Sequence, residues 1–339
     1  MTDRVLLTGI SGFLGGHVAL ALLNAGFKVR GSVRDLNKAK KVRKTLSRVG
    51  ADDARLEFVS LDLLEDAGWN EAALDCRYVV HTASPFFIAM PPDRNDLIRP
   101  AVEGTRRAVG AALSAGVERI VLTSSIAAIV YGHAAPSRPF TGDDWSDIGQ
   151  PDITAYVESK TSAERAAWDM VETAGRRECL AAINPGVILG PLLDDDPGTS
   201  GTIVQRIMTG GLPALPRIFV DVIDVRDVAA VHLAAMTTPE AGGRRFIVAD
   251  RSMSFLQVAN VLRAEFPDRA SRIPKREIPD WLLRLARLVS GTARDSLAEL
   301  GPAKTTDAGP ARALLGKPFI PAEDAIVATA RSLIANGLV

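Results

Sequence analysis

Short apolar runs alternate with longer amphipathic stretches along the first 250 residues of the chain. The apolar runs predict strands at 4–7, 27–33, 56–61, 78–82, 119–124, 179–184 and 245–248, and the amphipathic stretches predict helices at 14–23, 37–46, 69–74, 96–115, 154–173 and 227–236. The strand segments are continuously apolar, which is typical of strands buried on both faces. The pattern therefore predicts an α/β protein with a parallel sheet covered by helices on both faces.

The pattern changes after residue 185. Proline and glycine cluster between Pro185 and Pro216, which predicts long loops outside the sheet. From residue 255 the pattern is mostly helical and is interrupted by prolines. We therefore expect two units: a first domain of residues 1–185 plus about 225–250, and a smaller, mostly helical C-terminal lobe of about 186–224 plus 251–339.

Composition and charge narrow the class of protein. The chain has 339 residues, 47% hydrophobic and 24% charged, which is ordinary globular composition. Its 40 basic and 40 acidic residues cancel, so charge favours neither a nucleic acid nor an anionic membrane as partner. No apolar run reaches the roughly 18–20 residues of a membrane helix, and the N-terminus resembles no signal peptide. We expect a cytoplasmic protein.

The cysteines and histidines give no sign of a metal or disulfide framework. Cys76 and Cys179 lie far apart in apolar runs, and the four histidines form no ligand-spaced cluster. We therefore expect no metal site.

The first predicted strand is followed by a glycine-rich turn. Its glycines are Gly9, Gly12 and Gly15, and a helix follows directly. Glycines at such positions let a backbone turn tightly and approach a pyrophosphate, which the helix N-terminus then binds. The alternative is a glycine-rich turn that binds nothing. The context of strand, turn and helix favours a dinucleotide site.

A tyrosine and a lysine lie four residues apart at the start of the long helix at 154–173. Tyr156 and Lys160 would share one helix face. An ammonium group favours the ionised form of a neighbouring phenol, which makes the phenol a usable proton donor near neutral pH. On its own this spacing is usually an ordinary helix surface. Together with the glycine turn it indicates an acid–base pair beside a cofactor.

The glycine spacing and the Tyr156/Lys160 pair together resemble the extended short-chain dehydrogenase/reductase family. Further resemblance comes from segments 80–85, 122–125, 184–186 and 224–228. Segments 33–35 and 156–161 most resemble the dihydroflavonol 4-reductase, cinnamoyl-CoA reductase and yeast methylglyoxal-reductase group. This resemblance implies a doubly wound Rossmann domain, and it covers nearly the whole chain.

The resemblance also implies the residues that contact the cofactor. They are Gly9, Ser11, Gly12, Phe13, Leu14, Gly15, Arg34, Lys41, Asp62, Leu63, Thr82, Ala83, Ser84, Thr123, Tyr156, Lys160, Pro185 and Val187. An acid at the end of the second strand binds the ribose 2′-hydroxyl of NAD, whereas an arginine there accommodates the 2′-phosphate of NADP. Arg34 occupies that position, so NADP(H) is expected over NAD(H), although Asp35 follows directly. The resemblance places Lys41 as a second phosphate ligand.

In the family, hydride passes reversibly between a nicotinamide and a carbonyl carbon. The resemblance implies that Tyr156 donates the proton, Lys160 assists it and binds the nicotinamide ribose, and Ser125 binds the carbonyl oxygen. Ser124 is the competing serine, because neighbouring strand residues face opposite sides. Apolar residues near the sheet edge suggest an apolar or aromatic small-molecule carbonyl or alcohol, with candidate contacts at Phe86, Phe87, Met90, Ser125, Leu192 and Leu193.

Three functions stay open at the level of sequence. The first is an NADPH-dependent aldehyde or ketone reductase. The second is an NAD-linked sugar-nucleotide epimerase or a 3β-hydroxysteroid-type dehydrogenase. The third is a redox sensor that binds the cofactor only as a ligand. Relatives in this group include monomers and dimers, so either a monomer or a homodimer is expected.

Overall fold

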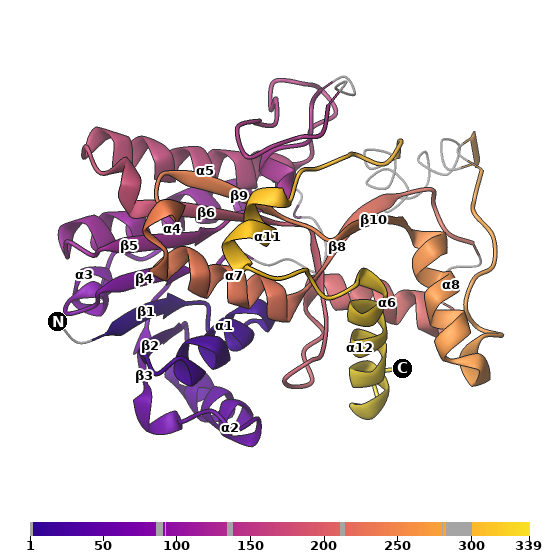
Figure 1. The fold of residues 1–339 in the computed structure, drawn as a ribbon, viewed down its shortest axis with the longest axis horizontal. Helices are drawn as coiled ribbons and strands as arrows, with labels where there is room; N and C mark the ends of the chain where they lie inside the picture. Colours follow the sequence, from indigo (N-terminus) through magenta and orange to yellow (C-terminus); the bar gives the residue numbers. More distant parts are fainter. Residues whose placement is uncertain are drawn as a thin grey trace.

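A seven-stranded parallel sheet forms the centre of the molecule (Figure 1). The computed structural model describes residues 3–85, 91, 93–133, 138–210, 214–279, 281–282 and 300–339. The strand order is β3-β2-β1-β4-β5-β6-β9. The order reverses between β1 and β4, which is the doubly wound Rossmann arrangement. The predicted fold class is confirmed. The strands are β1 (Arg4–Thr8), β2 (Lys28–Val33), β3 (Leu56–Ser60), β4 (Tyr78–His81), β5 (Arg119–Thr123), β6 (Leu180–Pro185) and β9 (Arg244–Val248).

Helices cover both faces of this sheet, as the continuous apolar strands predict. Val5 and Leu7 point into one core cluster, and Leu6 between them points into another. The first cluster includes residues of α1 (Phe13–Asn24), α2 (Ala39–Arg48) and α7 (Val225–Thr237). The second includes residues of α3 (Trp69–Ala73), α4 (Asn95–Ser114) and α5 (Ala155–Thr173). Each buried Val or Leu stabilises the fold by roughly 1.5–3 kcal/mol, so both faces contribute to the core.

The helix that contains Tyr156 and Lys160 is fixed at its start and along its length. Thr154 caps α5 by accepting a hydrogen bond from the N–H of Val157 at 3.3 Å. Such a cap satisfies one of the free N–H groups at a helix start. Further along, α5 packs beside α4, and alanines such as Ala167 and Ala112 lie buried on these two helices. The first turn of α5 is thereby held at the carboxyl edge of the sheet.

A second, three-stranded sheet lies outside the first, in the order β10-β8-β7. Its strands are β7 (Val187–Leu189), β8 (Phe219–Asp224) and β10 (Arg251–Ser254), and it packs with α6 (Gly198–Thr209), α8 (Phe255–Glu265) and α12 (Ala322–Ala335) around a separate apolar cluster. The expectation of long loops between Pro185 and Pro216 is therefore wrong for β7 and α6. The helix α11 (Gly309–Leu315) packs against α7. The division into two lobes stays a prediction.

Candidate active site

The carboxyl ends of the central strands bring several predicted residues to one edge of the sheet. Thr8 ends β1, His81 ends β4 and Thr123 ends β5. Thr8 and His81 are direct partners across the β1–β4 pair. This is the point where the strand order reverses, and ligands of doubly wound folds bind in the crevice there. The edge is therefore the candidate site.

The turn between β1 and α1 depends on two of its glycines. Gly9 has a φ of +73°, and a Cβ atom there would lie 2.8 Å from the backbone of Ala83. A Cβ atom on Gly15 would lie 2.0 Å from the carbonyl oxygen of Gly9. Neither position accepts a side chain without a shift of backbone. The glycines thus let β1, α1 and the end of β4 approach one another closely.

The N-terminus of α1 points toward this edge with its N–H groups uncapped by side chains. Gly12, the N-cap residue, provides no side-chain bond, and the first turn contains no acidic residue. A helix start of this kind favours an anion such as a phosphate. The Phe13 ring packs edge-on against His17, with the ring centroids 5.5 Å apart, and Ser11 is exposed beside it. The predicted residues Ser11, Gly12, Phe13 and Leu14 are together at this helix start.

The segment after β4 is tied to β1. The Thr82 hydroxyl donates to the carbonyl oxygen of Thr8 at 2.7 Å, and the N–H of Ala83 donates to the Thr8 hydroxyl at 3.2 Å. The next residue, Ser84, accepts a hydrogen bond from Lys160 Nζ at 3.0 Å. These bonds join the predicted cofactor segment 82–84 to both β1 and α5.

The residues predicted to select the cofactor lie beyond the ends of β2 and β3. Arg34 is exposed directly after β2. The Asp35 carboxylate accepts the N–H of Asn37 at 2.9 Å, so it caps the following turn. Lys41, in the first turn of α2, pairs with Asp195 at 2.5 Å, a contact that sequence reasoning did not predict. Beyond β3, the Asp62 carboxylate accepts the N–H of Leu64 at 2.8 Å.

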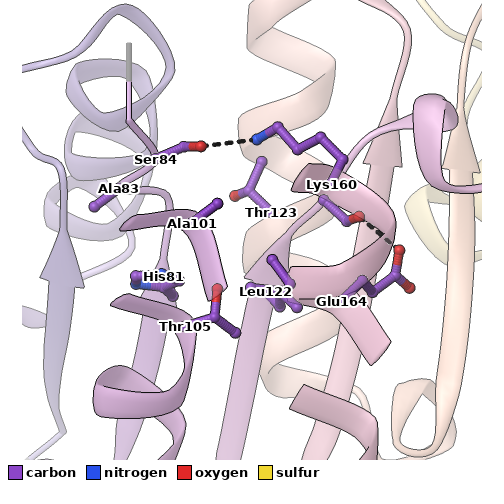
Figure 2. Close-up of a pocket in the computed structure, with 11 residues that line it drawn as sticks. His81, Ala83, Ser84, Ala101, Thr105, Leu122, Thr123, Lys160 and Glu164 are labelled. Atoms are coloured by element: carbon purple, nitrogen blue, oxygen red, sulfur yellow. Dashed lines mark hydrogen bonds between the residues drawn. The ribbon is translucent and has the colours of Figure 1, made fainter. Parts of the chain in front are cut away.

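Tyr156 and Lys160 share one face of α5 at this edge, and Figure 2 shows Lys160 bonded to Ser84. Lys160 Nζ lies 5.8 Å from the centroid of the Tyr156 ring while it donates to Ser84. Tyr156 itself is 40% exposed, unusual for a large ring next to a buried helix face. An exposed phenol beside an ammonium group is accessible to a ligand in the crevice.

The two candidate serines use their hydroxyl groups differently. Ser124 donates its hydroxyl hydrogen to Glu164 Oε2 at 2.5 Å. The Ser125 hydroxyl oxygen accepts the N–H of Ala127 at 3.1 Å, a bond that does not use its hydrogen. A hydroxyl that only accepts retains its donor. The geometry therefore separates Ser124, whose donor is occupied, from Ser125, whose donor is not used by this bond.

A buried carboxylate that sequence reasoning missed lies behind these serines. Glu164, on α5 one turn beyond Lys160, is 1% exposed. Arg245 of β9 pairs with it at 2.6 Å, and Asn184 of β6 donates to it at 2.7 Å. Asn184 also donates to the carbonyl oxygen of Ser125 at 3.1 Å. The network links α5, β6 and β9 to the serine segment. The available signal in the sequence was a charged residue among alanines, since Glu164 lies between Ala163 and the pair Ala166 and Ala167.

Two fully buried histidines orient hydroxyl groups at the same edge. His232 of α7 shares a hydrogen bond with Thr123 at 2.7 Å, while its Nδ1 lies 2.8 Å from the Val228 carbonyl oxygen. Since a carbonyl only accepts, Nδ1 holds the hydrogen and Nε2 accepts from Thr123. His81 similarly bonds Thr8 at 2.7 Å. Burial lowers the pKa of His232 to about 4 and that of His81 to about 3, so both are neutral at pH 7.

A small cavity lies beneath Lys160 (Figure 2). It measures about 20 Å³, room for little more than a water molecule. Polar and apolar residues both line it: His81, Ala83, Ser84, Ala101, Thr105, Leu122, Thr123, Ser124, Lys160, Ala163 and Glu164.

The predicted substrate contacts are only partly described. Phe86, Phe87 and Met90 lie outside the described residues. Leu192 packs against the apolar cluster of the second sheet, and Leu193 packs against the cluster that contains α1. Contact of either leucine with a substrate stays a prediction. Pro185 ends β6 and Val187 begins β7, where the chain passes from the first sheet to the second.

In the part of the chain that the structure describes, no helix has the length and apolar character needed to cross a bilayer. The same residues contain no group of three or more His, Cys, Asp or Glu arranged to bind a metal ion.

Comparison with known proteins gives consistent matches. Residues 5–249 match the NAD dependent epimerase/dehydratase family. Ketoreductase azaE of Aspergillus niger is 35% identical over 305 residues, which cover 83% of this chain and 88% of that protein. Cinnamoyl-CoA reductase CAD2 of Medicago truncatula is 34% identical over 269 residues, 78% of this chain and 81% of that protein. The crystal structure of yeast methylglyoxal/isovaleraldehyde reductase Gre2 complexed with NADPH matches with a TM-score of 0.82 at 28% identity, covering 99% of this chain and 100% of Gre2.

Proposed function

This chain belongs to the NAD dependent epimerase/dehydratase family, and from that premise we propose that it reduces an aldehyde or ketone to the alcohol with NADPH. The observation that supports this most directly is the shared face of Tyr156 and Lys160, with Lys160 bonded to Ser84 at the edge of the sheet. The names of the relatives, a ketoreductase, a cinnamoyl-CoA reductase and a methylglyoxal reductase, agree with carbonyl reduction.

The described residues fit a dinucleotide. Gly9 and Gly15 let β1, α1 and the end of β4 pack closely, which brings the start of α1 to the edge of the sheet, and the N–H groups there offer donors to a pyrophosphate. Arg34 and Lys41 supply positive charge beyond β2, where the adenine ribose would lie. This charge favours NADP(H) over NAD(H), because a 2′-phosphate gains from it and a 2′-hydroxyl does not.

Tyr156 is proposed as the proton donor. When bound, the cofactor supplies a hydride to the carbonyl carbon. The Tyr156 hydroxyl gives its proton to the carbonyl oxygen as that oxygen becomes an alkoxide and then an alcohol. Lys160 favours the phenolate that remains, because its ammonium group lies one helical turn away. The reverse sequence oxidises an alcohol, with Tyr156 as the base.

Ser125 is proposed as the donor to the carbonyl oxygen, in preference to Ser124. The Ser124 hydrogen is bonded to a buried carboxylate, whereas Ser125 accepts from Ala127 and keeps its hydrogen for a ligand. A positioned hydroxyl donor stabilises the charge that builds on the oxygen during hydride transfer. Asn184 supports this position through the Ser125 carbonyl group.

The apolar cluster around β7, β8 and β10 supports a separate substrate-binding lobe made of residues 186–224 and 251–339. It is formed by strands and helices that follow β6 and β9, while α7 and β9 return to the first sheet. We propose that this lobe closes one side of the crevice and selects the carbonyl compound.

A panel of aldehydes, ketones and diketones, followed through the loss of NADPH absorbance, tests the reductase. The variant Tyr156→Phe should lose turnover by roughly 10²–10⁴-fold while its Kd for NADPH changes little. Tyr78→Phe is the matched control, because Tyr78 begins β4 at the opposite edge of the sheet, and it should keep activity. No NADPH oxidation with any compound of the panel would remove the reductase proposal. Equal activity of Tyr156→Phe and wild type would remove Tyr156 from its role.

The same measurements separate the competing functions. An NAD-linked epimerase or dehydrogenase would bind NADH as tightly as NADPH, so the two Kd values decide between it and the reductase. A redox sensor would bind NADPH yet leave every carbonyl compound unreduced.

A further inference from the structure

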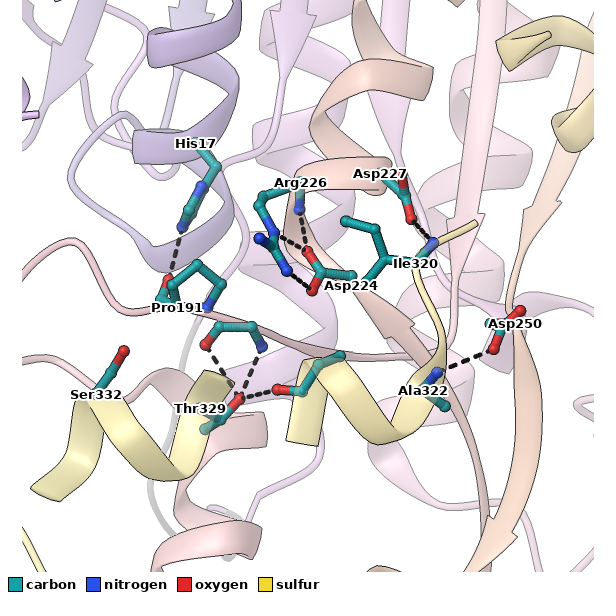
Figure 3. A network of polar contacts seen from close by, with 12 residues as sticks. His17, Pro191, Asp224, Arg226, Asp227, Asp250, Ile320, Ala322, Thr329 and Ser332 are labelled. Carbon is teal, nitrogen blue, oxygen red and sulfur yellow. Dashed lines mark hydrogen bonds and ion pairs between the residues drawn. The ribbon is translucent and has the colours of Figure 1, made fainter. Parts of the chain in front are cut away.

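A short segment between β7 and α6 crosses the nucleotide-binding part of the molecule. We call residues 190–196 the strap. Polar side chains on one face of α12 and at its C-cap hold the strap, and Figure 3 shows two of them, Thr329 and Ser332. The Thr329 hydroxyl accepts the N–H of Gly190 at 2.7 Å, and Ser332 accepts the N–H of Leu192 at 3.0 Å. Asn336 donates to the carbonyl oxygen of Asp194 at 3.0 Å. The spacing of three and four residues places these donors and acceptors on one helix face.

The other side of the strap contacts the two helices that follow β1 and β2. His17 of α1 donates to the carbonyl oxygen of Pro191 at 2.9 Å, as Figure 3 shows. Arg48 of α2 donates to the carbonyl oxygen of Leu193. The Leu193 side chain lies 3.2 Å from where a Cβ atom of Gly16 would be. The strap is therefore fixed between α12 and the pair α1 and α2 by bonds to its main chain.

This placement brings two acidic side chains to Lys41. Lys41 Nζ lies 2.5 Å from Asp195 Oδ1 and 3.5 Å from Asp194 Oδ2. The hydrogen bond with Asp195 is the main cause that raises the pKa of Lys41, and the same bond lowers the pKa of Asp195. All three groups keep contact with solvent, so the pair is weak and sensitive to salt. Lys41 is also the ammonium that the proposed function assigns to the 2′-phosphate.

We propose that Asp195, with Asp194 beside it, sets how strongly the protein distinguishes NADPH from NADH. This inference rests on the proposed function. The 2′-phosphate and the Asp195 carboxylate are both anions that interact with the ammonium group of Lys41. When NADPH binds, either the Lys41–Asp195 ion pair weakens or the phosphate lies close to the negative charge of Asp195. NADH has a hydroxyl there and leaves the pair intact. The acidic strap thus lowers NADPH affinity below what Arg34 and Lys41 alone would give.

The test is the Kd of each cofactor, measured by titration calorimetry at low salt with the full-length protein. Asp195→Asn should tighten NADPH binding about two- to five-fold, the range of an exposed ion pair, and should leave the Kd for NADH unchanged. Glu240→Gln is the matched control, because it also removes one negative charge, but in the turn between α7 and β9, away from Lys41. It should change neither Kd.

A second background makes the assignment specific to Lys41. In Lys41→Met, the further change Asp195→Asn should no longer tighten NADPH binding by more than the control change does. The inference is overturned if Asp195→Asn leaves the NADPH Kd unchanged or weakens it. It is also overturned if NADH gains equally, or if the gain persists without Lys41.

Failure of this inference differs from failure of the proposed function. If the wild-type protein reduces carbonyl compounds with NADPH but Asp195→Asn does not tighten NADPH binding selectively, the proposed function stands and the proposed role of the strap fails. A wild-type protein that binds neither cofactor loses both.

Discussion

Replacing Arg245 with methionine removes the positive partner of a carboxylate that is closed off from solvent. The Arg245 side chain is 6% exposed and that of Glu164 is 0% exposed. The arginine donates to both carboxylate oxygens, at 2.6 and 3.2 Å, and to the carbonyl oxygen of Gly142 at 2.8 Å. Its guanidinium also stacks on the Trp145 ring, 3.7 Å from the centroid. Methionine has a similar length but offers neither charge nor donors.

The expected loss in free energy of unfolding is about 4.5–5 kcal/mol. Leaving one member of a buried ion pair alone costs about 3–5 kcal/mol. Ser124 and Asn184 still donate to Glu164, so we take about 3 kcal/mol for this part. The bond to Gly142 adds about 1 kcal/mol, and the contact with Trp145 adds about 0.5–1 kcal/mol. Because native proteins are stable by about 5–15 kcal/mol, a loss of this size is a large part of the total and shifts the urea midpoint clearly.

The assay is urea unfolding followed by circular dichroism, with the change taken from the midpoint at constant slope. Arg94→Met is the matched control, because Arg94, the N-cap residue of α4, also pairs with a carboxylate of α5. Arg94 pairs with Glu158 of α5 with side chains 52% and 31% exposed, so its loss should cost no more than about 1 kcal/mol. The double variant Glu164→Gln/Arg245→Met should recover part of the loss, because no buried charge remains alone. If Arg245→Met lost no more stability than Arg94→Met, the argument from burial would be refuted.

Three further predictions test other parts of the structure. Gly9→Ala and Gly50→Ala both place alanine at a positive φ, +73° and +85°, and each should lose about 1–3 kcal/mol in urea unfolding. Only Gly9→Ala should also weaken cofactor binding, because a Cβ atom there would meet Ala83. An unchanged cofactor Kd in Gly9→Ala would contradict this close approach. Burial lowers the pKa of His81 to about 3 and of His232 to about 4 from 6.5, so the unfolded chain binds the extra protons as pH falls below 6.5. Each histidine therefore costs no stability above pH 6.5 and costs progressively more toward pH 3–4, about 1–2 kcal/mol at pH 5. The urea midpoint should be lower at pH 5 than at pH 7.5, and equal midpoints would contradict the argument. Thr329→Val leaves the N–H of Gly190 without its partner and should lower the free energy of unfolding by about 1–3 kcal/mol. The control Thr237→Val, at an exposed position, should lower it by less than about 0.5 kcal/mol. Equal losses would show that the strap does not depend on Thr329.

Local sequence patterns were sufficient for the central sheet. All seven predicted strand segments overlap strands of that sheet, and the predicted helices between them are present within a few residues. Strands such as β4 and β6 are buried along their whole length, so their apolar runs were unambiguous. The glycine turn was equally predictable, because Gly9 and Gly15 are close in sequence and contact each other within that turn.

The second sheet could not be predicted from local pattern. Strand β7 has three residues and pairs with β8, which begins about 30 residues later, and β8 pairs with β10 in the opposite direction. Such a short strand has no periodicity of its own and exists because its partners satisfy its backbone. Proline and glycine around it indicated loops, and this was wrong for β7 and α6.

The sequence by itself determined the parallel sheet, the glycine turn after β1 and the helix face shared by Tyr156 and Lys160, because each depends on residues close together in the chain. Only the tertiary structure decided which charges meet. Glu164 and Arg245 are 81 residues apart and Lys41 and Asp195 are 154 apart. It also decided that Ser124 gives its hydrogen to Glu164 while Ser125 accepts one from Ala127. Pairing over such distances depends on how whole elements pack, and no local pattern contains that information.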